Sequence, residues 1–263
     1  MRKRKEVATV YSQKQIAAGI YDMWIETGLA LQAKAGQFIS VYTQDKSALL
    51  PRPISICEVD TQNQRLRIVY RVAGKGTNEF SQYQKGDRID ILGTLGNGFP
   101  IEAANGKRVF LMGGGIGVPP MLETAKRIKA ECDASTKVDM IMGYRNADMF
   151  LKEDLEQYGE LHIATEDGSV GTKGNVMHAI DAEGLDADVI FACGPMPMLR
   201  AIKKYAEEKN IPAYISLEER MACGVGACLG CVVKTKEVDH HSHVNNARIC
   251  TDGPVYLASE VDI

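Results

Sequence analysis

Apolar and polar residues alternate along several of six short segments between residues 7 and 96 of the chain. These segments are rich in Val, Ile and Tyr, and polar turn-forming residues separate them. Alternation with a period of two predicts β-strands that bury one face. The predicted strands are 7–16, 19–27, 36–43, 54–60, 65–72 and 87–96. Six short strands at this spacing predict a small antiparallel β-barrel, which we place at residues 1–101.

The pattern changes near residue 102, where short apolar strands begin to alternate with helical segments. Strands are predicted at 107–115, 138–145, 161–167 and 188–194, and helices at 119–131, 149–159, 175–181 and 197–210. This alternation predicts a parallel sheet with helices on both faces, over residues 102–212. Residues 213–263 form a cysteine-bearing module. The predicted fold class is therefore α+β multidomain, with an antiparallel β-barrel, an α/β parallel-sheet domain and a small C-terminal module.

Composition narrows the class of protein without changing this outline. Of the 263 residues, 45% are apolar and 25% are charged, which is typical of a globular chain. The net charge of −3 gives no basic footprint for nucleic acid. The basic start MRKRKE precedes no apolar segment, so we expect neither a signal peptide nor a membrane span. Seven cysteines, an odd number, indicate a reducing compartment, and we expect a cytoplasmic protein.

Four of the cysteines form the most specific motif. Cys223, Cys228, Cys231 and Cys250 follow the spacing C-x4-C-x2-C, then eighteen residues, then C. This spacing is typical of the thiolate ligands of a plant-type [2Fe–2S] cluster, and glycines within the run allow tight folding around it. A zinc site or four unlinked buried thiols are the alternatives.

Two turns of the predicted α/β domain carry candidate binding residues. A glycine turn lies between a strand and a helix, where backbone N–H groups can face a pyrophosphate, and it comprises Gly113, Gly114, Gly115 and Gly117. A second turn ends the strand 188–194 and comprises Cys193, Gly194, Pro195 and Met196. It could lie against a flat nicotinamide ring. Tight packing is the alternative for the first turn, and a buried cysteine before a helix explains the second equally well.

The predicted barrel carries a third group of candidates. Arginine suits a phosphate, and serine can donate to a ring nitrogen or carbonyl. The group comprises Arg52, Pro53, Ile54, Ser55, Val69, Tyr70, Arg71, Gly76 and Thr77, the last two in a predicted glycine loop at 74–77. Singly these are ordinary strand or turn residues, but together they predict a phosphorylated, ring-bearing cofactor.

The remaining cysteines and histidines fit simpler interpretations. His240, His241 and His243 lie in a polar stretch between the third and fourth cysteines of the motif, and we predict a solvated loop there. Cys57 and Cys132 have no partners in the sequence and are predicted to be packing residues.

With these motifs in this order, the chain resembles the ferredoxin–NADP reductase superfamily over essentially its whole length. The runs ERMACGVGACLGC and RICTDGP are most similar to those of the electron-transfer subunits of type B, NAD-dependent dihydroorotate dehydrogenases. This resemblance implies that the barrel group binds FAD and that the two α/β turns bind NAD. It also implies that the four cysteines hold a [2Fe–2S] cluster.

The resemblance further implies a role in pyrimidine biosynthesis. The family's electrons come from an FMN-containing dihydroorotate dehydrogenase catalytic subunit and pass through [2Fe–2S] and FAD to NAD⁺. A heterotetramer of two catalytic and two electron-transfer chains is expected, and this chain needs no acid–base catalytic residue. Glu166 and Asp167 favour NAD over NADP, although Arg145 could meet a 2′-phosphate.

Two other functions remain open. The chain could be the small flavin/iron–sulfur subunit of another NAD(P)H–ferredoxin-type oxidoreductase, such as a bifurcating one. It could also be a non-catalytic redox sensor whose cluster controls binding to another protein, although such a sensor has little use for complete flavin and nicotinamide sites.

Overall fold

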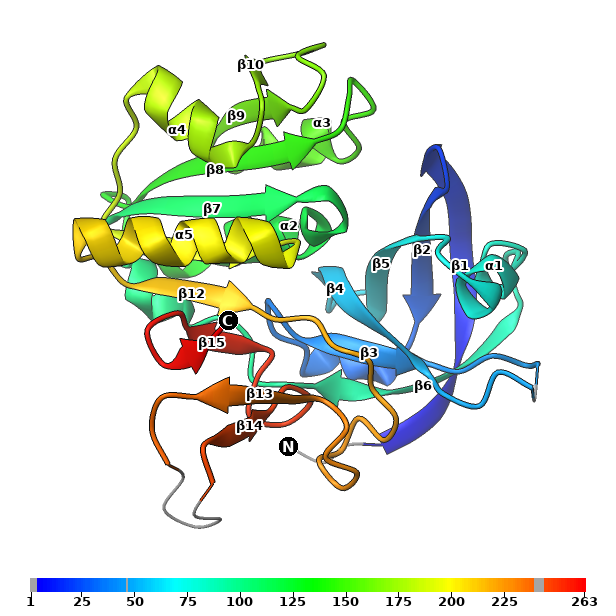
Figure 1. The fold of residues 1–263 in the computed structure, drawn as a ribbon. Helices are drawn as coiled ribbons and strands as arrows, with labels where there is room; N and C mark the ends of the chain where they lie inside the picture. Colours follow the sequence, from blue (N-terminus) through cyan, green and yellow to red (C-terminus); the bar gives the residue numbers. More distant parts are fainter. Residues whose placement is uncertain (1–3, 46, 239–243) are drawn as a thin grey trace.

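The computed structural model describes residues 4–45, 47–238 and 244–263. Figure 1 shows a barrel beside a helix-covered sheet, with the C-terminal segment lying against both. The loop histidines His240, His241 and His243 fall outside the described residues, so the prediction made for them stays untested.

The N-terminal part is a closed six-stranded barrel, as predicted. Its strands are β1 (Arg4–Ala17), β2 (Ile20–Glu26), β3 (Phe38–Val41), β4 (Arg52–Asp60), β5 (Arg65–Arg71) and β6 (Arg88–Leu95). They follow the order β1-β2-β5-β4-β3-β6, and β6 pairs with β1 to close the barrel. Aliphatic side chains at alternating positions fill the interior, among them Met23 and Ile25 of β2 and Leu66 and Ile68 of β5. The alternation marks the strands because each one buries a single face.

Short helical turns connect the strands: η1 (Gly28–Leu31), α1 (Lys75–Phe80) and η2 (Ile101–Ala104). The glycine loop predicted at 74–77 is wrong in part, because α1 begins at Lys75. The Thr77 hydroxyl accepts the N–H groups of Ala73 at 2.9 Å and Gly74 at 3.2 Å, which caps the first turn. Phe80 then buries its ring edge-on against Tyr70. This tertiary contact therefore stabilises a helix whose sequence shows no periodic pattern of apolar residues.

A seven-stranded sheet forms the second part of the molecule. Its strands are β7 (Arg108–Gly114), β8 (Lys137–Tyr144), β9 (Glu160–Thr165), β10 (Thr172–Lys173), β11 (Val189–Cys193), β12 (Ala213–Ser216) and β15 (Val255–Leu257). In the order β10-β9-β8-β7-β11-β12-β15, every pair is parallel except the last. The predicted parallel sheet is confirmed, with one antiparallel strand added at its edge.

Helices cover both faces of this sheet, as predicted. They are η3 (Gly115–Gly117), α2 (Pro119–Glu131), α3 (Lys152–Leu155), α4 (Val176–Glu183) and α5 (Met196–Lys209). Val109 and Leu111 of β7 pack on the α2 side, whereas Phe110 and Met112 pack on the side of α4 and α5. No helix in the described part of the chain has the length and apolarity needed to cross a membrane.

The helix predicted at 149–159 is much shorter than expected, because α3 covers only Lys152–Leu155. Leu151 precedes it in the left-handed region, at φ 65°, and this ends any continuous helix. Phe150 instead packs edge-on against Tyr144, with ring centroids 5.4 Å apart. Burial of this aromatic pair decides the local conformation.

The C-terminal module contains a small three-stranded sheet in the order β14-β13-β16. Its strands are β13 (Val232–Thr235), β14 (Asn246–Arg248) and β16 (Val261–Asp262). The division at residues 212 and 213 stays a prediction, and the large sheet crosses it, since β12 and β15 both belong to that sheet.

Helix α2 packs on the outside of barrel strand β4 and joins the two large units. The buried Glu123 carboxylate accepts the N–H of Val59 at 2.9 Å and pairs with Arg127 at 2.6 Å. Burial raises the pKa of Glu123, and its hydrogen bonds and the charge of Arg127 oppose that rise. Lys126 donates to Glu58 and to the carbonyl of Val59, both at 3.0 Å.

A second ionic contact joins the barrel to α3. The Arg67 guanidinium pairs with Asp22 at 2.9 Å within the barrel and with Asp154 at 3.0 Å across the interface. Both Arg67 and Asp22 are buried, so the pair is desolvated and depends on its geometry. These contacts fix the orientation of the barrel relative to the sheet.

Glu123→Ala is expected to lower the free energy of unfolding by about 2 kcal/mol, because it leaves the buried Val59 N–H without an acceptor. The matched control is Glu131→Ala, which removes the exposed partner of the same Arg127 and should cost less than about 0.5 kcal/mol. Denaturant unfolding of the cofactor-loaded protein measures both. Equal losses in the two variants would contradict the role of Glu123.

Candidate functional site

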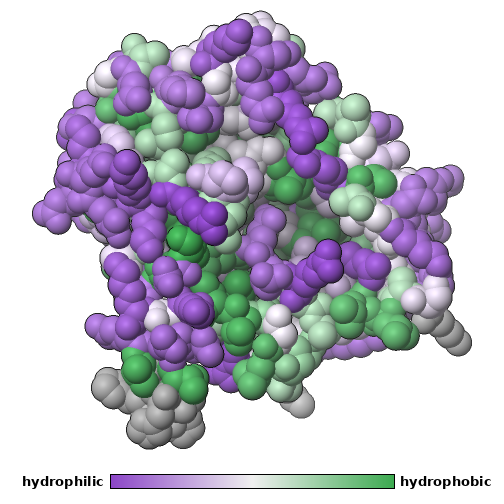
Figure 2. Space-filling model, in the orientation of Figure 1, coloured by the Kyte–Doolittle hydropathy of each residue, from purple (hydrophilic) through white to green (hydrophobic). Residues whose placement is uncertain are grey.

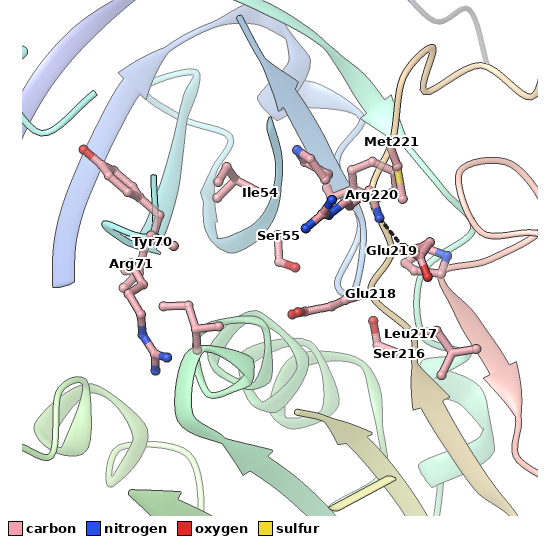
Figure 3. Close-up of a pocket in the computed structure, with 16 residues that line it drawn as sticks. Ile54, Ser55, Tyr70, Arg71, Ser216, Leu217, Glu218, Glu219, Arg220 and Met221 are labelled. Carbon is pink, nitrogen blue, oxygen red and sulfur yellow. Dashed lines mark hydrogen bonds between the residues drawn. The ribbon is translucent and has the colours of Figure 1, made fainter. Parts of the chain in front are cut away.

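A cleft of about 530 Å³ lies between the barrel and the segment that follows β12 (Figure 3). Six of the residues predicted to contact a flavin line it, from β4 and β5. They are Pro53, Ile54, Ser55, Val69, Tyr70 and Arg71. The structure thus brings together on one wall two sequence segments that are separated by a turn.

Tyr70 is held in a fixed orientation on this wall. Its hydroxyl donates to Gln13 at 2.8 Å, and its ring stacks on Tyr21 with centroids 5.9 Å apart. Burial raises the pKa of Tyr70 far above its usual value, so the hydroxyl stays protonated. The ring is only 2% exposed and packs in the barrel interior, so Tyr70 holds this wall of the cleft rigid from behind.

Arg52, Gly76 and Thr77 do not lie on the wall of this cleft but form a group beside α1. A Cβ added to Gly76 would lie 2.3 Å from Nε of Arg52, so only glycine leaves room for that guanidinium. Arg52 also donates to the carbonyl of Leu50. Thr77 is occupied in capping α1, next to the cleft residue Ala73.

The opposite wall of the cleft is absent from the sequence prediction. It consists of residues 216–221, with Phe38 and Pro254 beside them. Figure 3 shows Glu218, Glu219, Arg220 and Met221 along this wall. The one available signal was positional, because this segment leaves the carboxyl end of β12, and ligands bind at such strand ends in α/β sheets.

A second cleft, of about 360 Å³, lies at the carboxyl ends of the parallel strands. The predicted residues on its wall are Gly114, Gly115, Gly117, Gly194 and Pro195. A Cβ on Gly117 would lie 2.3 Å from the carbonyl oxygen of Cys193, so glycine is required for the two turns to meet. The glycine turn therefore serves close backbone packing, and its middle residues Gly115 and Ile116 remain partly exposed to the cleft.

Three predicted nucleotide-contact residues do not line this cleft. Cys193 is fully buried in the core on the α2 side, where burial raises the pKa of its thiol. A Cβ on Gly113 would lie 2.6 Å from Sδ of Met142, which gives that glycine a packing role. Met196 begins α5, and Met198 reaches the cleft in its place.

Residues of opposite charge face the far end of the second cleft. Arg145, which follows β8, and Glu166, which follows β9, both line it. The Asp167 carboxylate instead accepts the N–H of Ser169 at 2.9 Å in its own turn. Of the predicted acidic pair, only Glu166 lines the cleft.

The two clefts form one continuous space, because Arg71, Ile116 and Glu218 line both of them. Glu218 is open to the cleft, yet the surrounding walls raise the pKa of its carboxyl, and the Arg71 guanidinium opposes that rise. Flat rings bound in the two clefts can therefore meet at this junction.

The four motif cysteines are all free and form a cradle at the edge of the molecule, with Cys231 and Cys250 buried and Cys228 exposed. The Cys223 sulfur accepts the N–H groups of Ala227 at 3.3 Å and Val225 at 3.4 Å. Burial acts to raise the pKa of Cys223, but backbone hydrogen bonds outweigh it and lower the pKa to about 6. Burial and the adjacent Cys231 thiol raise the pKa of Cys250.

The cradle has the backbone geometry that its glycines predict. Gly224 and Gly226 adopt positive φ angles of 67° and 85°, which turn successive amides inward. Four thiols with amides aimed at sulfur fit the ligands of an iron–sulfur cluster, whose charge such donors stabilise.

The cradle directly adjoins the first cleft. Met221 lines that cleft and precedes Cys223 by two residues, so the two Cα atoms lie within roughly 7 Å of each other. Pro254, on the same wall, follows Cys250 by four residues. One continuous segment therefore carries both the cleft wall and the cysteines.

Solved structures with this architecture include flavin reductases. The structure described as "Insights into flavin-based electron bifurcation via the NADH-dependent reduced ferredoxin-NADP oxidoreductase structure" aligns with a TM-score of 0.86 and 30% identity, over 97% of this chain and 89% of that one. A ferredoxin NADP⁺ reductase from Neisseria gonorrhoeae with bound FAD and NADP aligns with a TM-score of 0.65 and 17% identity, over 78% and 91%. The second likeness concerns the fold alone.

Two family models match the chain. The "Oxidoreductase NAD-binding domain" matches residues 111–204, and the "Iron-sulfur cluster binding domain of dihydroorotate dehydrogenase B" matches residues 218–262. The predicted NAD-binding and iron–sulfur parts of the chain are thereby confirmed, while the domain bounds and the roles of individual residues stay predictions.

Relatives that match over almost the whole chain include proteins described as "Dihydroorotate dehydrogenase B (NAD(+)), electron transfer subunit". The protein from Bacillus caldolyticus is 44% identical over 98% of both chains. The protein from Streptococcus mutans serotype c is 41% identical, again over 98% of both. The chain therefore belongs to the family of electron transfer subunits of NAD⁺-dependent dihydroorotate dehydrogenase B.

Proposed function

We propose that this chain carries electrons from a dihydroorotate-oxidising subunit to NAD⁺ in pyrimidine biosynthesis. The observation that carries the proposal is the continuity of the cysteine cradle, the first cleft and the second cleft. When bound, an iron–sulfur cluster exchanges single electrons, a flavin exchanges one or two, and NAD⁺ accepts a hydride. This chain's residues hold the three groups adjacent to one another.

We assign each bound group to a separate set of residues. We assign FAD to the first cleft, with Pro53–Ser55 and Val69–Arg71 against its ring system and the Arg52–Gly76 group near its phosphates. NAD is assigned to the second cleft, with its pyrophosphate at the glycine turn Gly113–Gly117. Cys223, Cys228, Cys231 and Cys250 are assigned as cluster ligands. Rigid contacts such as Tyr70 to Gln13 support this assignment, because they orient side chains before a ligand binds.

The partner that fits the cradle is an FMN-containing dihydroorotate dehydrogenase catalytic subunit, in an assembly of two catalytic and two electron-transfer chains. Val225 and Leu229 are 42% and 63% exposed and flank Cys228 in the sequence. Figure 2 shows apolar surface on the lower part of the molecule, where the C-terminal segment lies. Exposed apolar residues beside a redox centre favour a protein partner at this edge.

A second candidate function is supported by one specific observation, the TM-score of 0.86 to the bifurcating NADH-dependent reduced ferredoxin-NADP oxidoreductase structure. The dihydroorotate assignment is favoured because this chain is 44% identical to the Bacillus caldolyticus subunit but 30% identical to the bifurcating enzyme, at similar coverage of this chain. A non-catalytic redox sensor is disfavoured, because two well-formed clefts would have no use in it.

Seven free cysteines support the proposal of a cytoplasmic location.

The direct test is made on a tagged copy purified gently from its own cells. Anaerobic addition of dihydroorotate and NAD⁺ is expected to produce NADH, followed by absorbance. Orotate should form in equal amount, because the reaction transfers two electrons per turnover. If a preparation that retains flavin and cluster gives no NADH, the reductase alternative replaces this assignment, and reduced ferredoxin with NADP⁺ becomes the substrate pair to assay.

Cys228→Ser is expected to abolish the iron–sulfur absorbance and the dihydroorotate-to-NAD⁺ activity, because it removes one proposed thiolate ligand. NADH oxidation with ferricyanide should survive, since Cys228 lines neither cleft. Cys132→Ser is the matched control. That thiol is half-buried, and in the described part of the chain its hydrogen bond goes to the carbonyl of Ile101. Iron and sulfide analysis of both variants gives the result, and a full cluster in the Cys228 variant would contradict the assignment.

Glu166→Gln is expected to raise the kcat/KM for NADPH relative to NADH about tenfold, because it removes a negative charge that faces the ribose. Asp167→Asn is the control, since that carboxylate is bound within its own turn. Steady-state reduction of ferricyanide by each nucleotide provides the ratio. An unchanged ratio in the Glu166 variant would mean that the preference lies elsewhere.

A further inference from the structure

Two buried hydroxyl groups have no hydrogen-bond partner among the described residues. They are Oγ of Ser40 on β3 and the hydroxyl of Tyr256 on β15. Ser40 is completely buried and Tyr256 is 7% exposed. A buried hydroxyl without a partner is destabilising, and native proteins rarely retain one unless a ligand or another group completes it.

Tyr256 lies on the sheet side of the cysteine cradle. It packs in the same buried cluster as Cys231 and Cys250. A Cβ added to Gly253 would lie 2.8 Å from its hydroxyl oxygen, so the hydroxyl sits over the turn that follows Cys250. Burial raises the pKa of Tyr256, so the hydroxyl remains a donor.

Ser40 lies on the barrel side of the same cradle. A Cβ added to Gly224 would lie 3.3 Å from its Oγ, and Gly224 directly follows Cys223. The other side chains that approach Gly224 are Leu92 and Leu95, which offer no acceptor. The hydroxyl therefore faces the start of the cysteine run from within an apolar surface.

We propose that the Tyr256 and Ser40 hydroxyls donate hydrogen bonds to sulfur atoms of the iron–sulfur cluster or of its cysteine ligands, and that these bonds raise its reduction potential. The inference rests on the proposed role of the four cysteines as cluster ligands. Reduction makes the sulfurs more negative, so a fixed donor stabilises the reduced form more than the oxidised form. Sulfur is the acceptor that the four cysteines supply. Each hydroxyl lies beside a glycine close in sequence to one of them, Gly224 after Cys223 and Gly253 after Cys250.

The test compares Tyr256→Phe and Ser40→Ala with the wild type in the complete complex. Each substitution removes one hydroxyl oxygen. Tyr256→Phe keeps the aromatic ring, and Ser40→Ala keeps the Cβ atom. At a fixed applied potential, the ratio of reduced to oxidised cluster is expected to fall about tenfold in each variant, which for one electron is 59 mV. A redox titration followed by electron paramagnetic resonance measures the cluster separately from the flavins.

Tyr214→Phe is the matched control. Tyr214 lies on the neighbouring strand β12 but on the other face of the sheet, where its ring stacks on Phe191 with centroids 5.5 Å apart. The reduction potential of the cluster in the Tyr214→Phe variant should equal that of the wild type. Wild-type potentials in both Tyr256→Phe and Ser40→Ala, with the cluster intact, would overturn the inference and leave the hydroxyls as packing groups.

If the Tyr256→Phe variant loses its cluster, the measurement is made instead on wild-type protein labelled with fluorotyrosine. Fluorination makes each tyrosine hydroxyl a stronger hydrogen-bond donor. The cluster potential should then rise, and an unchanged potential counts against the Tyr256 bond. Failure of the underlying assignment looks different. In that case the wild-type complex itself gives no [2Fe–2S] resonance signal.

Discussion

The contact between α2 and barrel strand β4 is the constraint on which the rest of the structure depends. Glu123 lies at its centre, fully buried, and accepts a backbone N–H from a strand of the other unit. Since a desolvated carboxylate tolerates little displacement, this bond and the Arg67–Asp154 pair fix how the barrel meets the sheet. That orientation makes Arg71 of the barrel and Ile116 of the glycine turn share a junction. Neither cleft would reach the other if the two units rotated apart.

Much of the fold and part of the site could be predicted because the signals are local. Period-two alternation identifies the barrel strands, and Pro53–Ser55 and Val69–Arg71 line the cleft because they stand on those strands. Other parts depend on tertiary contacts that no local pattern encodes. The helix α1 forms because Thr77 caps it and Phe80 packs on Tyr70, and this draws Arg52 and Gly76 into a separate group. Residues 216–221 become a wall only because the chain leaves β12 beside the barrel, and Met198 replaces Met196 because of where α5 begins.

The cysteine cradle is asymmetric in its surroundings. Backbone amides gather at Cys223, next to the exposed Cys228, whereas Cys231 and Cys250 lie in the apolar core that extends from α4 and α5. The opposite directions of the Cys223 and Cys250 pKa values reflect this difference. A group held by all four thiols thus has one end in a polar, accessible environment and the other in the interior. The accessible end lies toward the surface where a partner can approach, and the interior end lies toward the sheet.

The cysteine segment leaves the large sheet at Ser216 and returns to it at Val255, and these two residues are direct neighbours in the antiparallel β12–β15 pair. Topologically, the segment between these two residues is an enlarged hairpin connection that carries all four cysteines, and β16 beyond it returns to pair with β13. Antiparallel neighbours can be joined by a turn of two residues, so the sheet does not need the segment to close. The length of this connection therefore serves the site and not the sheet, since residues 216–221 at its start form one wall of the first cleft. Any change in the length of the connection would change the shape of that cleft together with the setting of the cysteines.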